Sequence, residues 1–426
     1  MADLQAGVGA IAVALEQVMS DPQLLVERDS VLDQLIAENG RAEMVSAHTY
    51  RLTFQDALPA NFSAIALDNP AVNFPAPGSS SWQSGTMAPV AWAMPVGWTK
   101  LAEIAGKPNL TVVNVVMKQM ADTIDAVARL RDIFICAGDG TGLLGNITAV
   151  DGVNKIYTLN NNDYGARLLS KNMAVDVYNG TTLLGTSNIL SVSQGLGGTQ
   201  TVTVDTVPAG TVANSILRAP GLVSGSPSFV YGIPYWLSNA TTGLTVGLDR
   251  SVATNNFIIA NGVNAASSSV TPPLLRLPMD QIKQALGLKA VTNGKLKIQT
   301  HTGQKAAYEA IAGQMMTITR PDGKAPAGYD LLFQGDPSVN GCEVIENIHA
   351  HMQRWDYLNT ACWGKINWGN PPFWFTSEGR KVFQQMGTNG QITSGAASFM
   401  VDTVNYYVDN PKSQSSIYNA KQPAGY

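Results

Sequence analysis

One stretch, between residues 109 and 142, constrains the fold of this chain more than any other. Apolar side chains recur there at steps of three and four residues, with charged side chains opposite them, which is the period of an amphipathic α-helix. Pro108 cannot lie inside such a helix, and Asn109 or Thr111 can accept its first free amide hydrogens. Gly138 is the first residue suited to a left-handed stop. At roughly 1.5 Å per residue the helix would span about 40 Å, so the rest of the chain should pack around it. The apolar positions are Val113, Val116, Met117, Met120, Ile124, Val127, Leu130 and Phe134.

The low charge content indicates a surface largely covered by a partner. Charged residues make up 14% of the 426 residues, although the hydrophobic content of 45% is that of a globular chain. A net charge of −4 gives no overall attraction to nucleic acid or to anionic membranes. The start MADLQ lacks the basic region of a secretory signal, three cysteines cannot pair completely, and no apolar run is long enough to span a membrane. We therefore expect a soluble protein made in a reducing cytosol.

Acidic side chains dominate residues 1–45, where eight acids face two bases for a net charge of −6. Two short helices are predicted here, over 4–19 and 29–37. The acidic arm is either a solvated helical face or a segment that docks on a basic neighbour. Residues 276–324 hold eight bases and three acids, a net of +5, and could receive it.

The segment from Leu52 to Thr99 has no lysine or arginine. Strand-like runs at 50–55, 63–67 and 90–98 flank a tip rich in Pro, Gly and Ser, which predicts a long hairpin. Left bare in solution, such a segment would be an aggregation hazard, so we expect it to lie against another subunit. The alternative is an ordinary edge hairpin folded on its own domain. The predicted interface residues are Phe74, Trp82, Trp92 and Trp98.

The remaining pattern predicts an α+β fold. Residues 155–218 alternate with period two between Gly-rich turns, which indicates a compact all-β module. A helix over 278–286, a strand over 295–300 and a helix over 302–316 follow. The last hundred residues read as β-strands.

A G-x-G-x-x-G run occurs at Gly140, Gly142 and Gly145, but a helix precedes it where a dinucleotide site needs a strand. It is not a phosphate-binding loop either, since no Lys-Ser or Lys-Thr follows. We interpret it as the helix stop and a tight turn.

Few polar residues form a catalytic pattern. His349 and His351 are two apart near Cys342, which makes zinc conceivable, but the spacing matches no zinc motif. Glu343 and Glu346 would suit a hydrolase only if both lined one cleft. We expect no catalytic, cofactor or metal site, and a structural protein in preference to an enzyme.

The order of these parts resembles the major capsid proteins of tailed bacteriophages (Caudoviricetes), whose Hong Kong 97-like fold is shared with encapsulins. The likeness is most specific at ARLRDIFICAGDGTGLLG (residues 128–145), GLDRS (247–251) and VDNPKSQSSIYN (408–419). It implies a long spine helix, an extended β-hairpin loop, a mixed axial domain and an inserted all-β module. The implied segments are an N-terminal arm (1–49), the extended loop (50–100), a peripheral domain with the spine helix (101–145), the inserted β-module (146–220), the axial domain (221–372) and a peripheral return with the C-terminus (373–426).

The resemblance also implies a function. Such a subunit assembles with itself into pentamers and hexamers of an icosahedral shell, in the host cytoplasm, and encloses double-stranded DNA without sequence-specific binding. Scaffolding, portal and decoration proteins would be further partners, and the location would be the virion. Some family members cross-link a lysine of the extended loop to a neighbour's asparagine, and this loop has no lysine. Two alternatives remain: an encapsulin-like shell with an enzyme cargo, and a hydrolase with an attached β-module.

Overall fold

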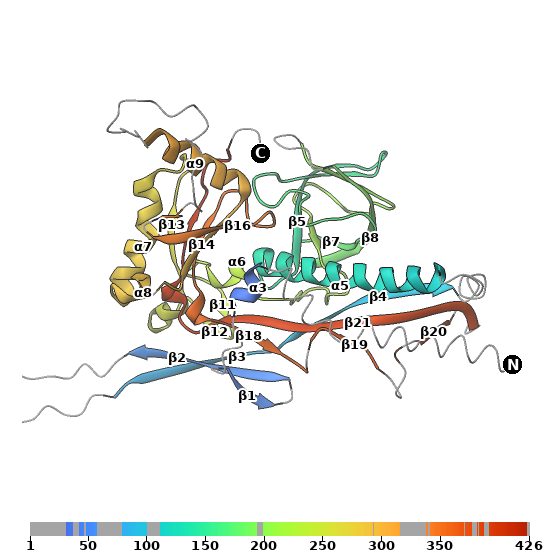
Figure 1. Ribbon diagram of the computed structural model, residues 1–426, viewed down its shortest axis with the longest axis horizontal. Coiled ribbons are helices and arrows are strands. Elements are labelled where there is room, and N and C mark those ends of the chain that lie inside the picture. The colour runs from blue at the N-terminus through green and yellow to red at the C-terminus, as the bar shows by residue number, and fades with distance from the viewer. Residues whose placement is uncertain are drawn as a thin grey trace, which may run out of the picture. The chain divides into compact units, whose positions relative to one another are not determined.

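The computed structural model divides the chain into two compact units, which are described one at a time (Figure 1). The first contains residues 1–38, 89–234 and 365–406, and the second contains residues 39–88, 235–364 and 407–426. The structure describes residues 31–36, 42–46, 48–57, 79–99, 111–193, 199–292, 294–315, 338–339, 341–369, 371–376, 381, 383–386 and 392–423.

The first unit is built on one long helix and one long strand. Helix α5 (Thr111–Ala137) runs beside β4 (Val90–Thr99) and β21 (Ile392–Val408), which pair antiparallel (Figure 1). This confirms the long helix, which begins two residues later than the first cap considered. Strands β18 (Trp363–Asn367), β19 (Phe373–Trp374) and β20 (Phe383–Met386) complete the five-stranded sheet. The short helix α3 (Val31–Leu35) contacts α5.

The predicted apolar face of α5 is the face that packs on the sheet. Met120, Ile124 and Val127 are at most 1% exposed. Their cluster is completed by residues of the helix and of the strands beside it, namely Ala128, Val96, Trp374 and Met400. Period alone identified this face correctly, because only apolar side chains can fill a core without costly unpaired charges.

The end of α5 differs from the expected left-handed stop at Gly138. Positive φ occurs two and four residues later, at Gly140 (84°) and Gly142 (74°). Gly138 is required for a different reason: a Cβ there would lie against the carbonyl of Phe134 and 2.8 Å from the backbone nitrogen of Gly232. The glycine run is thus a turn packed tightly on neighbouring backbone, as a non-nucleotide interpretation requires.

The predicted all-β module is a closed barrel of six strands in the order β10-β5-β6-β9-β8-β7. It starts at Leu143, directly after the glycine turn, earlier than the alternating pattern suggested. Its inward side chains, such as Tyr157, Val177 and Val202, are fully buried. The strands are β5 (Leu143–Asp151), β6 (Ile156–Leu159), β7 (Ala174–Asn179), β8 (Thr182–Ser193), β9 (Thr201–Val204) and β10 (Ile216–Arg218).

The second unit holds a six-stranded mixed sheet in the order β13-β22-β17-β14-β16-β15. Its strands are β13 (Asn261–Asn264), β22 (Ser415–Tyr418), β17 (Trp355–Asn359), β14 (Leu296–Thr300), β16 (Cys342–Glu346) and β15 (Ser338–Val339). Strand β22 lies between β13 and β17, so the end of the chain joins this sheet, whereas the expected return kept residues 373–426 in the peripheral domain. The chain crosses between units after residue 406.

Helix α7 (Pro272–Leu286) packs its apolar side on this sheet through Leu275, Met279 and Ile282. It begins six residues before the predicted start at Pro278, because Thr271 caps it and Pro272 occupies a first-turn position that needs no amide hydrogen. Helices α8 (Lys289–Thr292) and α9 (Thr302–Met315) follow. The smaller elements are α6 (Ile233–Trp236), β11 (Leu244–Thr245), β12 (Leu248–Asp249), η1 (Ala253–Ile258), η2 (Thr360–Cys362) and η3 (Pro411–Ser413).

The uncharged segment forms a hairpin, but with different strands from those expected. Strand β2 (Thr49–Ala57) pairs with β3 (Ser81–Met87), and β1 (Glu43–Ser46) extends this sheet. The run at 90–98 is β4, which leaves the hairpin and pairs with β21. The expected strand at 63–67 and the tip lie outside the described residues. Among the described helices, none is long and apolar enough to cross a membrane.

Candidate subunit interface

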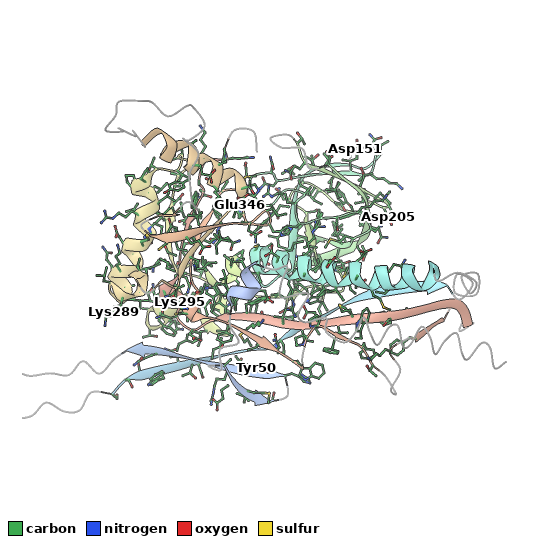
Figure 2. The ribbon with its side chains drawn as sticks, viewed as in Figure 1. Tyr50, Asp151, Asp205, Lys289, Lys295 and Glu346 are labelled. Carbon is green, nitrogen blue, oxygen red and sulfur yellow. The ribbon has the colours of Figure 1, made fainter. Side chains whose placement is uncertain are left out.

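The β2–β3 hairpin has two faces of opposite character (Figure 2, where Tyr50 marks β2). On one face Leu52, Phe54 and Met87 are at most 4% exposed. On the other face the side chains opposite one another in the paired part of the hairpin are exposed, because side chains alternate along a strand. That outward face consists of Arg51, Thr53, Gln55, Trp82, Ser84 and Thr86.

Trp82 is the largest apolar side chain on the outward face and is 57% exposed. Its indole nitrogen donates to the Ser80 hydroxyl at 3.0 Å, which orders the ring without burying it. Arg51 is the only charge among these six side chains, and Glu43, opposite it on β1, pairs with it at 2.9 Å. An exposed tryptophan on a nearly uncharged strand surface is typical of a protein contact.

The buried face of the hairpin is clamped by the turn between β11 and β12. The Thr86 amide donates to the Val246 carbonyl at 3.0 Å, and a Cβ on Gly85 would lie 2.5 Å from Val246 Cγ2. Phe54 adds a ring contact with Phe257 at 5.7 Å. Gly85 is therefore needed so that the strand can lie directly on the turn.

Val246 itself adopts a strained conformation, with φ of 45°. A β-branched residue in the left-handed region is a true outlier, and such strain persists only where surroundings enforce it. Here the Tyr235 hydroxyl accepts a hydrogen bond from the Val246 amide at 2.8 Å, and the Thr86 amide donates to the Val246 carbonyl. Arg250, in the GLDRS run, donates to Thr245 and Ser238 and so fixes the same turn.

The other three predicted interface residues have different settings. Phe74 lies outside the described residues. Trp92 is on β4, half-buried against the spine-helix core, with its ring edge-on to Phe134 at 5.5 Å. Trp98 is also on β4, where its backbone faces Ala396 of β21, and its side chain is outside the described set. The structure thus assigns Trp92 to the core of its own unit, because β4 belongs to the β21 sheet.

A second feature, a buried charge cluster, was missed by sequence reasoning. Arg131 of α5 is 2% exposed and donates through Nε and Nη2 to both oxygens of Asp402, each at 2.7 Å. Its Nη1 donates to Asp33 of α3 at 3.1 Å. Asp33 also accepts from the Tyr406 hydroxyl at 3.0 Å and lies 3.7 Å from the Lys365 ammonium.

Two cations and two carboxylates balance in this cluster. Burial on its own lowers the pKa of the Arg131 guanidinium, but the hydrogen bond and charge of Asp402, aided by the charge of Asp33, raise the net pKa above its ordinary value. Arg131 is therefore always charged. Asp33 was expected on a solvated or docking face of the acidic arm, and this expectation was wrong, since its carboxylate holds α3 inside its own unit.

The residues considered for chemistry serve other contacts. Glu343 pairs with Lys297, and Glu346 pairs with Lys305 at 3.3 Å, so the two acids do not share a proton-transfer site. His351 Nδ1 accepts the amide of Gln353. Among the described residues, no three His, Cys, Asp or Glu side chains come together as a metal site.

Comparison with known proteins then identifies the architecture. No known protein family matches the sequence, and no curated protein sequence matches it either. The structure, however, is similar to the capsid asymmetric unit of cyanophage A-1(L), with a TM-score of 0.53 and 10% identity over 92% of each chain.

The chain has the fold of a phage capsid protein. The likeness covers 92% of this chain. Looser likenesses occur to the capsid of a native GTA particle (TM-score 0.46, 9% identity, 92% of this chain and 90% of that one) and to an encapsulin complex of Synechococcus elongatus (0.39, 9%, 93% and 89%).

Proposed function

We propose that this chain is the major capsid subunit of a tailed bacteriophage, with a Hong Kong 97-like fold. In this proposal it forms hexamers and pentamers that close an icosahedral shell around double-stranded DNA. The cyanophage capsid likeness supports the fold, and the exposed outward face of the hairpin supports assembly. The net charge of −4 argues against tight, sequence-specific DNA binding.

The outward face of the hairpin is the observation that carries the proposal. Trp82 and the uncharged side chains around it would be covered by an adjacent subunit, and Phe74 would join them from the tip of the loop. Trp92 would act indirectly, through the packing of β4 on the spine helix, and Trp98 is retained as a proposed contact residue. Self-association would then need no catalysis or cofactor, only repeated contact between copies.

A shell of this kind would also have a place of assembly, a final location and partner proteins. Assembly would take place in the host cytoplasm and the final location would be the virion. A scaffolding protein, a portal and decoration proteins would be additional partners.

Electron microscopy of the purified chain tests the proposal directly. We expect closed shells with fivefold vertices, and particles from infected cells should contain double-stranded DNA. Shells filled with a protein cargo and no DNA would favour the encapsulin-like alternative. A monomer at high concentration that never assembles, with or without a scaffolding protein, would refute the proposal.

A further inference from the structure

A cavity of about 700 Å³ in the second unit joins an apolar floor to a basic rim. Its lining comes entirely from residues 276–343. Val291, Leu296 and Cys342 form the floor and are at most 8% exposed. Arg276 and Lys283 from α7 and Lys297 from β14 supply the rim. The cavity thus combines apolar side chains with a few convergent charged groups, as binding sites commonly do.

The rim keeps a positive surplus after its internal pairs are counted. Asp280 lies between Arg276 (3.2 Å) and Lys283 (3.1 Å) on α7, and Glu343 pairs with Lys297. Three cations thus face two carboxylates. Lys289 and Lys295 are exposed nearby, at the same end of this unit (Figure 2).

The rim is also accessible to a ligand. Arg276 engages Asp280 through Nε alone among its described bonds and is 66% exposed, so its guanidinium fork can receive a second carboxylate. Both Lys297 and Lys283 act on the Cys342 thiol at the floor, which burial otherwise gives a raised pKa. Lys283 and Lys297 line the cavity together with Cys342, and their side chains are 28% and 24% exposed, so a carboxylate bound to them would be only partly hydrated.

Such a pocket selects a chain segment that carries carboxylates next to apolar side chains. The first thirty residues of this chain fit that description, with five acids and one base. The closest match is the run LLVERDS at 24–30, which combines Leu24, Leu25 and Val26 with Glu27 and Asp29. Nucleic acid fits less well, because DNA-binding surfaces are broad basic stripes, whereas this rim sets three cations among two carboxylates.

Asp33, three residues after this segment, is anchored by its ion pair with Arg131. Since Asp33 is held by Arg131, residues 24–30 lie within ten residues of a fixed point on the first unit. The cavity is lined by a single stretch of chain and is open in the isolated subunit, so a second copy can fill it.

We propose that the acidic segment at residues 16–30 of a second copy docks in this cavity, with its carboxylates on Arg276, Lys283 and Lys297. This rests on the proposed function, since a shell supplies each cavity with a neighbouring arm. Each exposed ion pair contributes little alone, but the apolar floor and the repetition over many copies make the contact specific.

Zero-length cross-linking of a mixed-isotope particle tests the inference. Carbodiimide joins a carboxylate to a lysine amine as an amide with loss of water, so only touching groups react. Shells assembled from equal amounts of ¹⁴N- and ¹⁵N-labelled chain are treated and digested. We expect peptides that join Glu27 or Asp29 to Lys283 or Lys297 and carry one light and one heavy half. The Lys297–Glu343 pair is an internal positive control, and it joins halves of a single label.

Charge-reversal variants show whether the between-copy cross-link depends on the cations of the cavity rim. Arg276→Glu keeps both reactive lysines, and it should lower the between-copy yield at Lys283 about twofold to fivefold. Lys171→Glu, on an exposed site of the first unit, should leave it unchanged. Combining Arg276→Glu and Lys283→Glu with Glu27→Lys and Asp29→Lys should restore coupling between positions 27 and 283 with the charges exchanged. Salt at about 1 M should suppress the wild-type cross-link.

The outcomes separate the inference from the proposed function. Shells whose arm carboxylates couple only to other lysines, or only within one copy, would overturn the inference and leave the capsid function intact. Lysines protected in DNA-filled particles but reactive in empty ones would assign the cavity to phosphate and also overturn it. Protein that forms no shells yet gives the mixed-label cross-link at high concentration would support the docking and refute the capsid function.

Discussion

Arg131 and Asp402 lie 271 residues apart in the sequence and form a two-point ion pair, with both N–O distances at 2.7 Å. The pair ties the spine helix to the long strand β21, and Asp33 adds the helix α3 to the same point. Three segments of one unit thus meet at a single guanidinium. Because the cluster is buried, each member depends on the others for its charge balance.

Replacing Arg131 should therefore strongly destabilise the first unit. Arg131→Met leaves two buried carboxylates with too few partners, and we expect a loss of about 3–5 kcal/mol in the free energy of unfolding. Chemical denaturation of the unassembled protein measures it. Arg129→Met, on an exposed position of the same helix, should change the value by about 0.5 kcal/mol or less. Equal effects of the two substitutions would show that the cluster contributes nothing special.

Trp82→Asp should stop shell assembly while leaving the subunit folded. The side chain is 57% exposed, so the charge costs little in the monomer, but it would be buried at the proposed interface without a partner. Sedimentation measures assembly and circular dichroism measures folding. The matched control is Val153→Asp, a similar change at a 91% exposed site on the barrel. Normal shells from Trp82→Asp would remove the hairpin from the interface.

Gly85→Ala should loosen the clamp on the hairpin. Its new Cβ would meet Val246 Cγ2 at 2.5 Å and the Val246 carbonyl oxygen at 2.6 Å, so the strand must move away. Overpacking of this kind costs about 1–3 kcal/mol, which predicts exchange of the Thr86 amide hydrogen that is about tenfold faster or more. Hydrogen-exchange mass spectrometry provides the readout.

Two further variants control the clamp experiment. Gly152→Ala introduces the same methyl where nothing lies within 4 Å, so exchange at Thr86 should not change. Adding Val246→Gly to Gly85→Ala removes the side-chain clash and the left-handed strain but leaves the carbonyl contact, so protection should return in part. An unaltered Thr86 rate in Gly85→Ala itself would mean that the hairpin is not held by this turn.

Mature particles should be held together without covalent bonds between subunits. No lysine lies between Arg51 and Lys100, so the hairpin has no amine for an isopeptide bond. Denaturing electrophoresis should show one band near 45.2 kDa, the mass of a single chain. A ladder of multimers that survives denaturant and reducing agent would contradict this and point to a lysine elsewhere.

Local pattern was enough to predict the elements that bury one face of their own sequence. Helix α5 and its face Met120, Ile124 and Val127 follow from a single periodicity, and the barrel follows from alternation between glycine turns. The exposed Trp82 followed from the lack of charge around it. In each case the signal lies within a few tens of residues.

Local sequence pattern does not predict which distant segments pair with one another. The alternation in β4 predicts a strand but not its partner β21, about 300 residues later in the sequence. The sequence therefore places β4 in the hairpin, whereas the structure pairs it with β21. Asp33 looks like any of eight acids until Arg131 is brought to it, because a buried ion pair leaves no local trace. The same holds for β22, whose place between β13 and β17 depends on the whole sheet.

The chain enters and leaves the closed barrel at the same place. Its first strand β5 and its last strand β10 are hydrogen-bonded neighbours, with Leu143 opposite Arg218, and the Ala219 amide donates to the Gly142 carbonyl at the junction. An ancestral gene could therefore have gained the module in one insertion, without rerouting the helix before it or the segment after it. The same junction offers a place to exchange the barrel for another small domain while the flanking segments keep their course.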